Sequence, residues 1–254
     1  MTLAKQWLDK ARAVMNEIEE TQMDNIIKAA TAMANSIECG RWVHGFGCGH
    51  ATIPVEEIYP RIGSFVGFHP MVELPLTFFT RITGEMGIHQ FLFLERAEGY
   101  GVEIMKGYQF DERDTMWIFS HTGINNVNID VALEAKRKRM KVIAYGSAAA
   151  ARGKQTRHSS GKTIFDIADI VVDSCAPVED AMVAVKNHQD KLGPVSTMAF
   201  ITCVWLTVVS VGEILADRGF KLHIHPSHNV PGDTTARERL EEALATYKAR
   251  IAGV

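Results

Sequence analysis

A strand–helix–strand pattern between residues 116 and 147 constrains the fold more than any other part of the sequence. Residues 116–119 form an apolar run typical of a buried strand, and apolar residues then recur at helical spacing from Asn125 onward. The helical stretch ends in the basic cluster 136–139, which is favourable at a helix C-terminus, and a second apolar run follows at 141–145. The pattern predicts one βαβ unit and therefore a parallel sheet.

The turn between the first strand and the helix of this unit is rich in hydroxyl groups. It consists of Ser120-His121-Thr122-Gly123-Ile124-Asn125. Such a turn places its side chains beside the free N–H groups at the start of a helix, where an anion can bind. Because the turn contains no Lys or Arg, neutral donors and the helix dipole would hold that anion. Taken alone, however, a short polar turn before a helix more often only caps the helix.

Length, composition and charge limit the possible classes of protein. With 254 residues and 46% apolar residues, the chain can form one large domain with a substantial core. We expect a single domain over 1–254, with a helical extension at 1–38, a core at 39–220 and a C-terminal tail and helix at 221–254. The net charge of −3, with mixed signs, favours neither nucleic acid nor a membrane as partner. The four cysteines show no CxxC spacing and no secretory signal precedes them, which favours a cytoplasmic location.

One segment tests the expectation that no membrane is involved. The chain has no charged residue between Lys191 and Glu213, and this uncharged segment is long enough for a membrane span. The segment nevertheless contains five Ser and Thr residues and begins after Gly193-Pro194. We therefore predict a central buried helix rather than a span.

The remaining segments complete an alternating pattern of helices and strands. Two helical stretches with a break near Glu20-Thr21 are expected within residues 1–38, as a packing or dimerisation layer. Further strands are predicted at 42–46, 64–68 and 170–173. Further helices are predicted at 93–106, at 235–251 and after the first strand, where the helix carries Val55, Ile58 and Tyr59. An irregular region is expected from 70 to about 89, and a long loop at 148–162.

Five parallel strands separated by helices give a doubly wound α/β sheet, most simply in the order 2-1-3-4-5. The order reverses between the first and third strands, so the turns after Phe46 and Phe119 flank one crevice, where such sheets bind ligands. The first of these turns, Gly47-Cys48-Gly49-His50, only partly resembles a dinucleotide fingerprint, because the third glycine and the acidic residue are missing. We therefore expect no nicotinamide or other redox cofactor.

These motifs resemble the sugar isomerase (SIS) domain, a phosphosugar-binding fold. The turn Ser120–Asn125 resembles its phosphate loop, Gly47–His50 resembles its glycine turn, and Gly193–Thr197 is similar to the Ser-Thr opening of its central helix. The runs 157–162, 94–100 and 227–229 are similar to an uncharacterised bacterial subfamily of phosphosugar isomerases. The resemblance covers nearly the whole chain. It implies a flavodoxin-like sheet, a homodimer or homotetramer, a sugar phosphate as ligand and a site shared between subunits.

The resemblance also indicates which residues bind the ligand, and where the chain departs from the family. Many members have Ser or Thr at the position of His50, and heptose-phosphate members carry a catalytic His near the position of Cys203, Val204 and Trp205. Those three side chains cannot usefully transfer protons, so isomerase chemistry must come from elsewhere. The expected ligand-binding residues are Gly49, His50, Ser120, His121, Thr122, Gly123, Asn125, Ser147, Ser196 and Thr197.

Aldose–ketose interconversion through an enediol needs a base beside the carbon next to the carbonyl and a donor to the carbonyl oxygen. Glu57, Glu56 and then Glu98 are the candidate bases, and His188 or His158 could assist ring opening. Each of these residues is also typical of an ordinary structural role, such as an exposed charged face or, for Glu98, an ion pair along a helix.

Three histidines in the tail, His223, His225 and His228, form the one metal-like cluster in the sequence. Alternation places the first two on one face of an extended segment, as in many zinc sites. No carboxylate or cysteine stands at an obvious spacing, so a metal is the weaker interpretation.

Three functions therefore stay open. The leading hypothesis is an isomerase acting on a phosphorylated sugar. A phosphosugar lyase or etherase is the second, because the helix around Glu98-Gly99 resembles the acid-bearing helix of muramic-acid-phosphate etherases. The third is a non-catalytic phosphosugar sensor, whose transcriptional form is weakened by the lack of a preceding helix-turn-helix.

Overall fold

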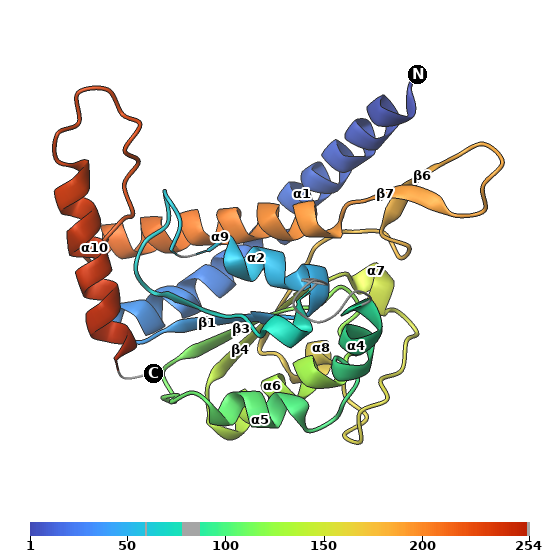
Figure 1. Ribbon diagram of the computed structural model, residues 1–254, viewed down its shortest axis with the longest axis horizontal. Helices are drawn as coiled ribbons and strands as arrows, with labels where there is room; N and C mark the ends of the chain where they lie inside the picture. Colours follow the sequence, from blue (N-terminus) through green and yellow to red (C-terminus); the bar gives the residue numbers. More distant parts are fainter. Residues whose placement is uncertain (59, 78–86, 253–254) are drawn as a thin grey trace.

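The computed structural model describes residues 1–58, 60–77 and 87–252, and it contains the predicted parallel sheet (Figure 1). The strand order is β2-β1-β3-β4-β5, which confirms the predicted doubly wound α/β fold and its order. The strands are β1 (Val43–Gly47), β2 (Phe68–Met71), β3 (Thr115–Phe119), β4 (Lys141–Gly146) and β5 (Ile170–Asp173).

Helices cover both faces of this sheet, and the side chains of each strand alternate between them. Trp117 and Phe119 of β3 belong to the apolar core shared with α1 (Leu3–Glu38) and α9 (Ser196–Asp217). Met116 and Ile118 belong to the second core, on the opposite face, as the period of two in a strand requires. The second core also contains residues of four helices (Figure 1): α4 (Gly87–Leu94), α5 (Tyr100–Lys106), α6 (Asn126–Arg137) and α8 (Ile164–Ile167).

The N-terminal region is a single helix, so the prediction of two helices with a break near Glu20-Thr21 is wrong. Neither Gly nor Pro occurs between Leu3 and Glu38, and the Thr21 hydroxyl donates to the backbone oxygen of Glu17 at 2.7 Å within the helix. The apolar residues lie on somewhat different faces of α1 before and after Thr21, and this change resembles a break in the sequence pattern. The N-terminal part of α1 extends beyond the sheet (Figure 1).

The charge-free segment forms the C-terminal part of a hairpin and then the central helix α9. Strands β6 (Ala181–Ala184) and β7 (Lys191–Pro194) pair antiparallel, and the sequence analysis missed them. The hairpin is held to α1 by the Trp7 indole N–H, which donates to the Gly193 oxygen at 3.1 Å. By length and composition α9 is the one helix among the described residues that could cross a membrane, but 56% of its most apolar stretch is buried inside the fold.

The helix predicted at 93–106 is two helices, α4 and α5. The chain leaves the first after Leu94 and starts the second at Tyr100, because Gly99 adopts a φ of 90°. The carboxylate of Asp130 accepts from the N–H groups of Gly99 at 2.7 Å and Gly101 at 3.1 Å, and it thereby caps the second helix. Within the break Glu95 is buried, whereas Arg96 and Glu98 are exposed.

The second strand begins later than predicted. Instead of 64–68 it spans Phe68–Met71, and Phe65 forms an isolated bridge with Ile224. Gly67, with a φ of 153°, redirects the chain at a point where a Cβ atom would approach Ile37 to 2.6 Å. A 3-10 turn, η2 (Leu74–Leu76), follows, while residues 78–86 of the predicted irregular region and Tyr59 lie outside the described residues.

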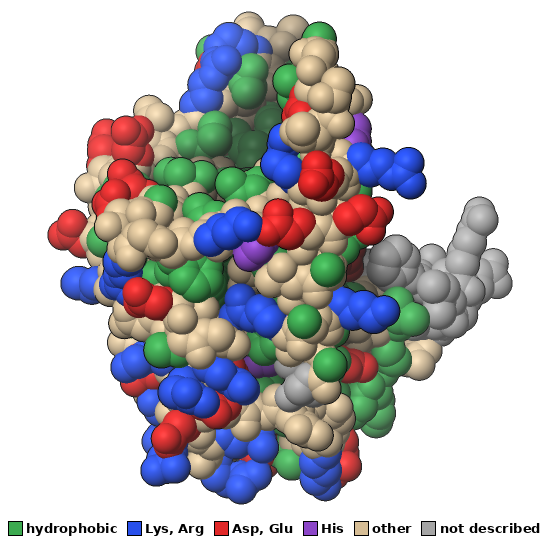
Figure 2. Space-filling view, turned by 90° about the vertical axis from the view of Figure 1, so that its left-hand side faces the viewer, with side chains coloured by type: hydrophobic (Ala, Val, Ile, Leu, Met, Phe, Trp, Pro, Cys, Tyr) green, Lys and Arg blue, Asp and Glu red, His purple; other side chains and the backbone are tan. Residues whose placement is uncertain are grey.

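Short helices and a terminal helix complete the fold. The turn after β1 contains η1 (Gly49–Thr52) and α2 (Ile53–Glu56), and α7 (Ala148–Ala151) lies in the predicted long loop. Helix α10 (Ala236–Ile251) confirms the predicted C-terminal helix. On the face that carries α10, acidic and basic side chains are interspersed (Figure 2).

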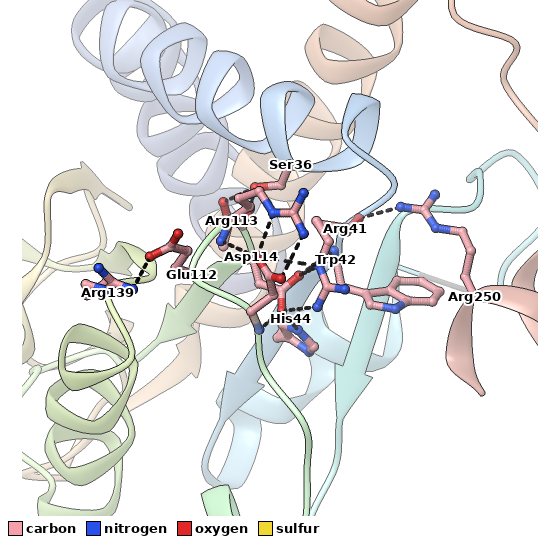
Figure 3. Close-up of polar contacts among 11 residues, drawn as sticks. Ser36, Arg41, Trp42, His44, Glu112, Arg113, Asp114, Arg139 and Arg250 are labelled. Atoms are coloured by element: carbon pink, nitrogen blue, oxygen red, sulfur yellow. Dashed lines mark hydrogen bonds and ion pairs between the residues drawn. The ribbon is translucent and has the colours of Figure 1, made fainter. Parts of the chain in front are cut away.

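A buried charge cluster joins β1, β2 and the start of β3 at the amino-terminal edge of the sheet (Figure 3). Both carboxylate oxygens of the fully buried Asp114 accept from the Arg41 guanidinium at 3.0 Å, and the carboxylate lies 3.4 Å from Nε2 of His44. Nδ1 of His44 is in turn 2.9 Å from Nδ1 of His69. Burial alone would raise the pKa of Asp114, but the hydrogen bonds from His44 and Arg41 outweigh it and lower the pKa to about 2.

The histidine pair makes the fold sensitive to acid. Burial, followed by the nearby charge of His44, lowers the pKa of His69 to about 4 from an ordinary value of 6.5. As pH falls from about 6.5 to 4, His69 binds a proton in the unfolded chain but not in the folded chain. The free energy of unfolding should therefore fall by up to roughly 3 kcal/mol. Urea unfolding across this pH range checks the prediction.

His69→Asn should flatten the pH dependence of stability between pH 6.5 and 4, whereas His188→Asn, at an exposed position, should leave it unchanged. Equal slopes for the wild type and His69→Asn would contradict this assignment.

Candidate functional site

A cavity of about 330 Å³ lies at the carboxyl ends of β1 and β3, where the strand order reverses. This is the crevice that the sheet order predicts. The turn after β1, the turn after β3, the last residues before the α4–α5 break and the start of α9 all contribute to its wall. Eight of the expected ligand-binding residues line it, namely Gly49, His50, Ser120, His121, Thr122, Asn125, Ser196 and Thr197.

The turn after β3 is held in shape by its own serine and glycine. The Gly123 N–H donates to Oγ of Ser120 at 3.1 Å, so the serine oxygen acts as acceptor within the turn and its hydrogen stays available for a ligand. Gly123 has a φ of 72°, and a Cβ atom there would lie 2.4 Å from the ring of Phe165. Gly123 thus shapes the turn without lining the cavity.

The turn after β1 brings backbone close to the same cavity. A Cβ atom on Gly47 would lie only 2.2 Å from the Ala51 oxygen, so this position admits only glycine at the observed geometry. The Thr52 hydroxyl donates to the Gly49 oxygen at 2.7 Å and closes the 3-10 turn. His50 lies on the exposed side of this turn and lines the cavity.

The start of α9 is already occupied by a carboxylate of the protein. Oδ1 of Asp180 accepts from the N–H groups of Val195 at 2.8 Å and Ser196 at 2.7 Å, and its Oδ2 accepts from the Ser196 hydroxyl at 2.7 Å. An anion bound at this helix start would have to displace Asp180. The turn after β3 is therefore the better anion position of the two.

Glu95 is a carboxyl group of this cavity that the fold holds largely out of water. Its residue surface is only 7% exposed, and Oε2 accepts from the Asn125 side-chain amide at 2.6 Å. Burial raises the pKa of Glu95 to about 7, and the Arg96 guanidinium, 3.9 Å away, only partly opposes the rise. A carboxyl group with such a pKa can both take up and release a proton near neutral pH.

His121 supplies an imidazole on the opposite side of the same turn. Both ring nitrogens are buried, and neither forms a well-aligned hydrogen bond among the described residues. Burial lowers the pKa of His121, although the charge of Asp180 and the nearby backbone of Val178 act in the other direction, so the ring is neutral at neutral pH. A neutral imidazole in this position is suited to donate to a ligand oxygen.

Two further polar side chains complete the wall. The Cys48 thiol donates to Oδ1 of Asn128 at 3.3 Å, and burial raises the pKa of Cys48 well above its usual value. The thiol is therefore protonated and a poor nucleophile.

The glutamates predicted as bases do not line the cavity, which corrects that prediction. Oε1 of Glu57 accepts from the Trp205 indole at 3.1 Å and pairs with Arg61 at 2.9 Å, because α2 ends at Glu56 and the chain turns away from the crevice. Glu56 is exposed. Glu98 is exposed too and accepts from the Ser159 N–H at 2.9 Å, which lowers its pKa along with the bond from the Ser159 hydroxyl.

The remaining predicted residues also lie elsewhere. His188 is exposed in the turn of the β6–β7 hairpin. Ser147 is buried: its hydroxyl donates to the Ala176 oxygen at 2.6 Å and accepts from the Ala150 N–H at 3.0 Å, which caps α7. His158 lies beneath the site, where its Nε2 is 3.0 Å from Asp130. Cys203, one of the three residues expected near a catalytic-histidine position, is fully buried in the core.

The tail histidines do not converge. Within the described ranges no three His, Cys, Asp or Glu side chains gather as a metal site. His223 instead lies 3.6 Å from Glu242 of α10. The metal interpretation of His223, His225 and His228 gains no support from this arrangement.

The sequence analysis missed Glu95 as a site residue, and it also missed Asp180. The helix predicted at 93–106 contains Glu95 without assigning it a role, and the pair Gly99 and Gly101 was the sequence signal for a break in that helix. Asp180 directly precedes the β6–β7 hairpin, which the sequence analysis did not predict. Its φ of 62° places it in a turn.

The fold and the cavity define a doubly wound α/β domain with its ligand crevice at the topological switch point. Comparison with known proteins specifies the family: the SIS domain matches residues 6–147, and the chain belongs to the SIS-domain family.

Similar proteins agree with this assignment. A UPF0309 protein of Oceanobacillus iheyensis is 31% identical over 251 residues, which cover 99% of each chain. A UPF0309 protein of Thermoanaerobacter pseudethanolicus is 30% identical and covers 97% of this chain and 98% of its own length. Among solved structures, the phosphoheptose isomerase of Neisseria gonorrhoeae has a TM-score of 0.56 at 10% identity, over 83% of this chain and 97% of its own. At such low identity the similarity concerns the fold.

The raised pKa of Glu95 can be tested without any ligand. In the unfolded chain this carboxyl group ionises near pH 4.5, whereas in the fold it ionises near 7, so ionisation costs stability as pH rises through that interval. Glu95→Gln should therefore gain up to roughly 3 kcal/mol relative to the wild type between pH 5 and pH 8. Denaturant unfolding at both pH values measures the gain.

Glu98→Gln is the matched control, since the pKa of Glu98 is lowered and the group stays ionised over the whole interval. A stability difference between the wild type and Glu95→Gln that does not change with pH would show that Glu95 ionises normally.

Proposed function

We propose that this protein binds a sugar phosphate in the switch-point cavity and interconverts its aldose and ketose forms through an enediol. Membership of the SIS-domain family supports the choice of a phosphosugar ligand. The single observation that carries the catalytic part is Glu95, a buried carboxyl group with a pKa of about 7 that lines the cavity beside the turn after β3.

The phosphate would bind at the turn Ser120–Asn125. Its hydroxyl groups and the start of α6, a helix of 12 residues, supply neutral donors and a favourable dipole. Asp180 fills the corresponding position at α9, which supports the turn as the anion position, and the sugar would then extend from the turn toward Glu95. Thr197 and His50 line the wall that the sugar would contact.

The proton transfer would use Glu95 as base. Its carboxylate would remove the proton from the carbon next to the carbonyl while the carbonyl oxygen takes a proton from the His121 ring, which forms the enediol. The other enediol hydroxyl would then give its proton to the His121 ring as Glu95 returns the carbon-bound proton to the former carbonyl carbon. The neutral His121 ring would donate to the carbonyl oxygen as negative charge develops there. The bound phosphate would raise the pKa of Glu95 further, which favours its protonated form after the first step.

The expected homodimer or homotetramer stays a prediction. Val209 of α9 is 66% exposed and apolar, and Trp205 is partly exposed on the same helix, which supports a contact between copies there.

Ser120→Ala and Thr122→Ala should each weaken binding of a sugar phosphate. Each removes one hydrogen bond to a charged group, which corresponds to about tenfold or more in the dissociation constant. Isothermal titration calorimetry measures the change, and Thr246→Ala, at a partly exposed position of α10 outside the cavity, serves as the control. Unchanged affinity in both turn variants would reduce the turn to a helix cap.

Glu95→Gln should leave sugar-phosphate binding within a fewfold of the wild type while removing most of the turnover and the exchange of the carbon-bound proton with deuterated water. Proton NMR of the bound sugar in deuterated buffer measures the exchange. Glu98→Gln, outside the cavity, should exchange at the wild-type rate.

In the wild type, the exchange rate at sugar-phosphate concentrations well below saturation should rise with pH and reach half its maximum near pH 7, because only the ionised form of Glu95 acts as base. If the wild type exchanges no proton of any sugar phosphate that it binds, the isomerase proposal fails and a non-catalytic sensor becomes the better account.

A further inference from the structure

A second cavity lies on the other side of Asn125, and its wall differs in charge from the first. It has a volume of about 180 Å³ and is lined by Arg96, Ile124, Asn125, Asn126, Gln155 and Arg157. Asn125 lines both cavities, so the turn after β3 separates them. Two arginines and three side-chain amides make this wall rich in hydrogen-bond donors.

Arg157 stands out because its charge is not neutralised by the fold. Within the described part of the chain it forms no hydrogen bond or ion pair through its side chain, and it is exposed. Among the described residues, the Arg96 guanidinium pairs with Glu95 alone, at 3.9 Å, and the Arg96 backbone oxygen accepts from the Asn126 amide at 2.9 Å. The guanidinium groups of this cavity are therefore open to an anion from outside the protein.

The main cavity has the opposite character. Among its described lining residues are the carboxyl groups of Glu95 and Asp180 and no Lys or Arg. A ligand that carries two anionic groups could not place both there without bringing one close to a carboxylate. The arginines across Asn125 offer the second group a position with the matching charge.

We propose that the Arg96–Arg157 cavity binds a second anionic group of the ligand whose phosphate occupies the turn Ser120–Asn125. The substrate is then a sugar with two anionic groups, either a bisphosphate or a phosphorylated sugar acid. This inference rests on the proposed phosphosugar function and narrows its substrate class. Ile124, Asn125 and Asn126 form the partition that such a ligand spans, and these residues lead into α6, whose start favours negative charge on both sides.

Calorimetric titration with three probes tests the proposal: glucose 6-phosphate with one anionic group, and fructose 1,6-bisphosphate and 6-phosphogluconate with two. We expect the wild type to bind at least one doubly anionic probe about tenfold or more tightly than glucose 6-phosphate. Preference for the bisphosphate or for the sugar acid identifies which of the two sources the cavity accepts.

Arg157→Gln should lower the preference for the doubly anionic probe about tenfold and leave the affinity for glucose 6-phosphate unchanged. Arg152→Gln is the matched control, because this exposed arginine belongs to the same loop and lines neither cavity. Arg157 is preferred to Arg96 for the test, since removing Arg96 would also change the ionisation of Glu95.

The possible outcomes separate this inference from the proposed function. If the wild type binds glucose 6-phosphate without preferring either doubly anionic probe, or if Arg157→Gln and Arg152→Gln have the same effect on the preference, the second anion site is contradicted and the phosphosugar function stands. If the wild type binds none of the three probes, the proposed function is contradicted and this inference falls with it.

Discussion

The hydrogen bond from the Asn125 amide to Glu95 joins the two halves of the site. It links the end of α4 to the turn after β3 and holds a carboxyl group out of water at the switch point. The position of Glu95 depends in turn on the break between α4 and α5. That break is fixed by Gly99 and by the Asp130 carboxylate, which His158 contacts at 3.0 Å from the loop beyond β4. A structural pair beneath the cavity thus determines where its acidic group points.

The two carboxyl groups of the cavity differ in how many hydrogen-bond donors of the protein contact them. Asp180 is bound by three donors at the start of α9, so it cannot act as a free base. Glu95 has one short hydrogen bond and a distant arginine, so desolvation dominates its pKa. The two carboxyl groups in one cavity thereby have different surroundings: three donors hold Asp180, whereas Glu95 is close to its midpoint at neutral pH.

The sheet and its crevice were predictable from the sequence, while the catalytic candidate was not. Apolar runs at 116–119 and 141–145 and the glycine and hydroxyl turns gave the strand order and the place of the crevice, because these signals are local. The directions of the glutamate side chains, in contrast, depend on contacts between residues that are distant in the sequence. Glu57 points away from the cavity because α2 ends after one turn. Glu95 points into the cavity because the chain leaves α4 just before it, and Asp130, far along the sequence, caps the start of α5. Such a contact between distant residues leaves no periodic pattern in the sequence.

The central claim, that the Glu95 carboxyl group is poised near neutral pH, is tested most directly by its own titration. Carbon-13 NMR of the protein labelled at the glutamate side-chain carboxyl carbons, with Glu95→Gln used to assign the resonance, follows this group alone. The account predicts a midpoint near pH 7 in the free protein. A midpoint near 4.5, the ordinary value for glutamate, would contradict it.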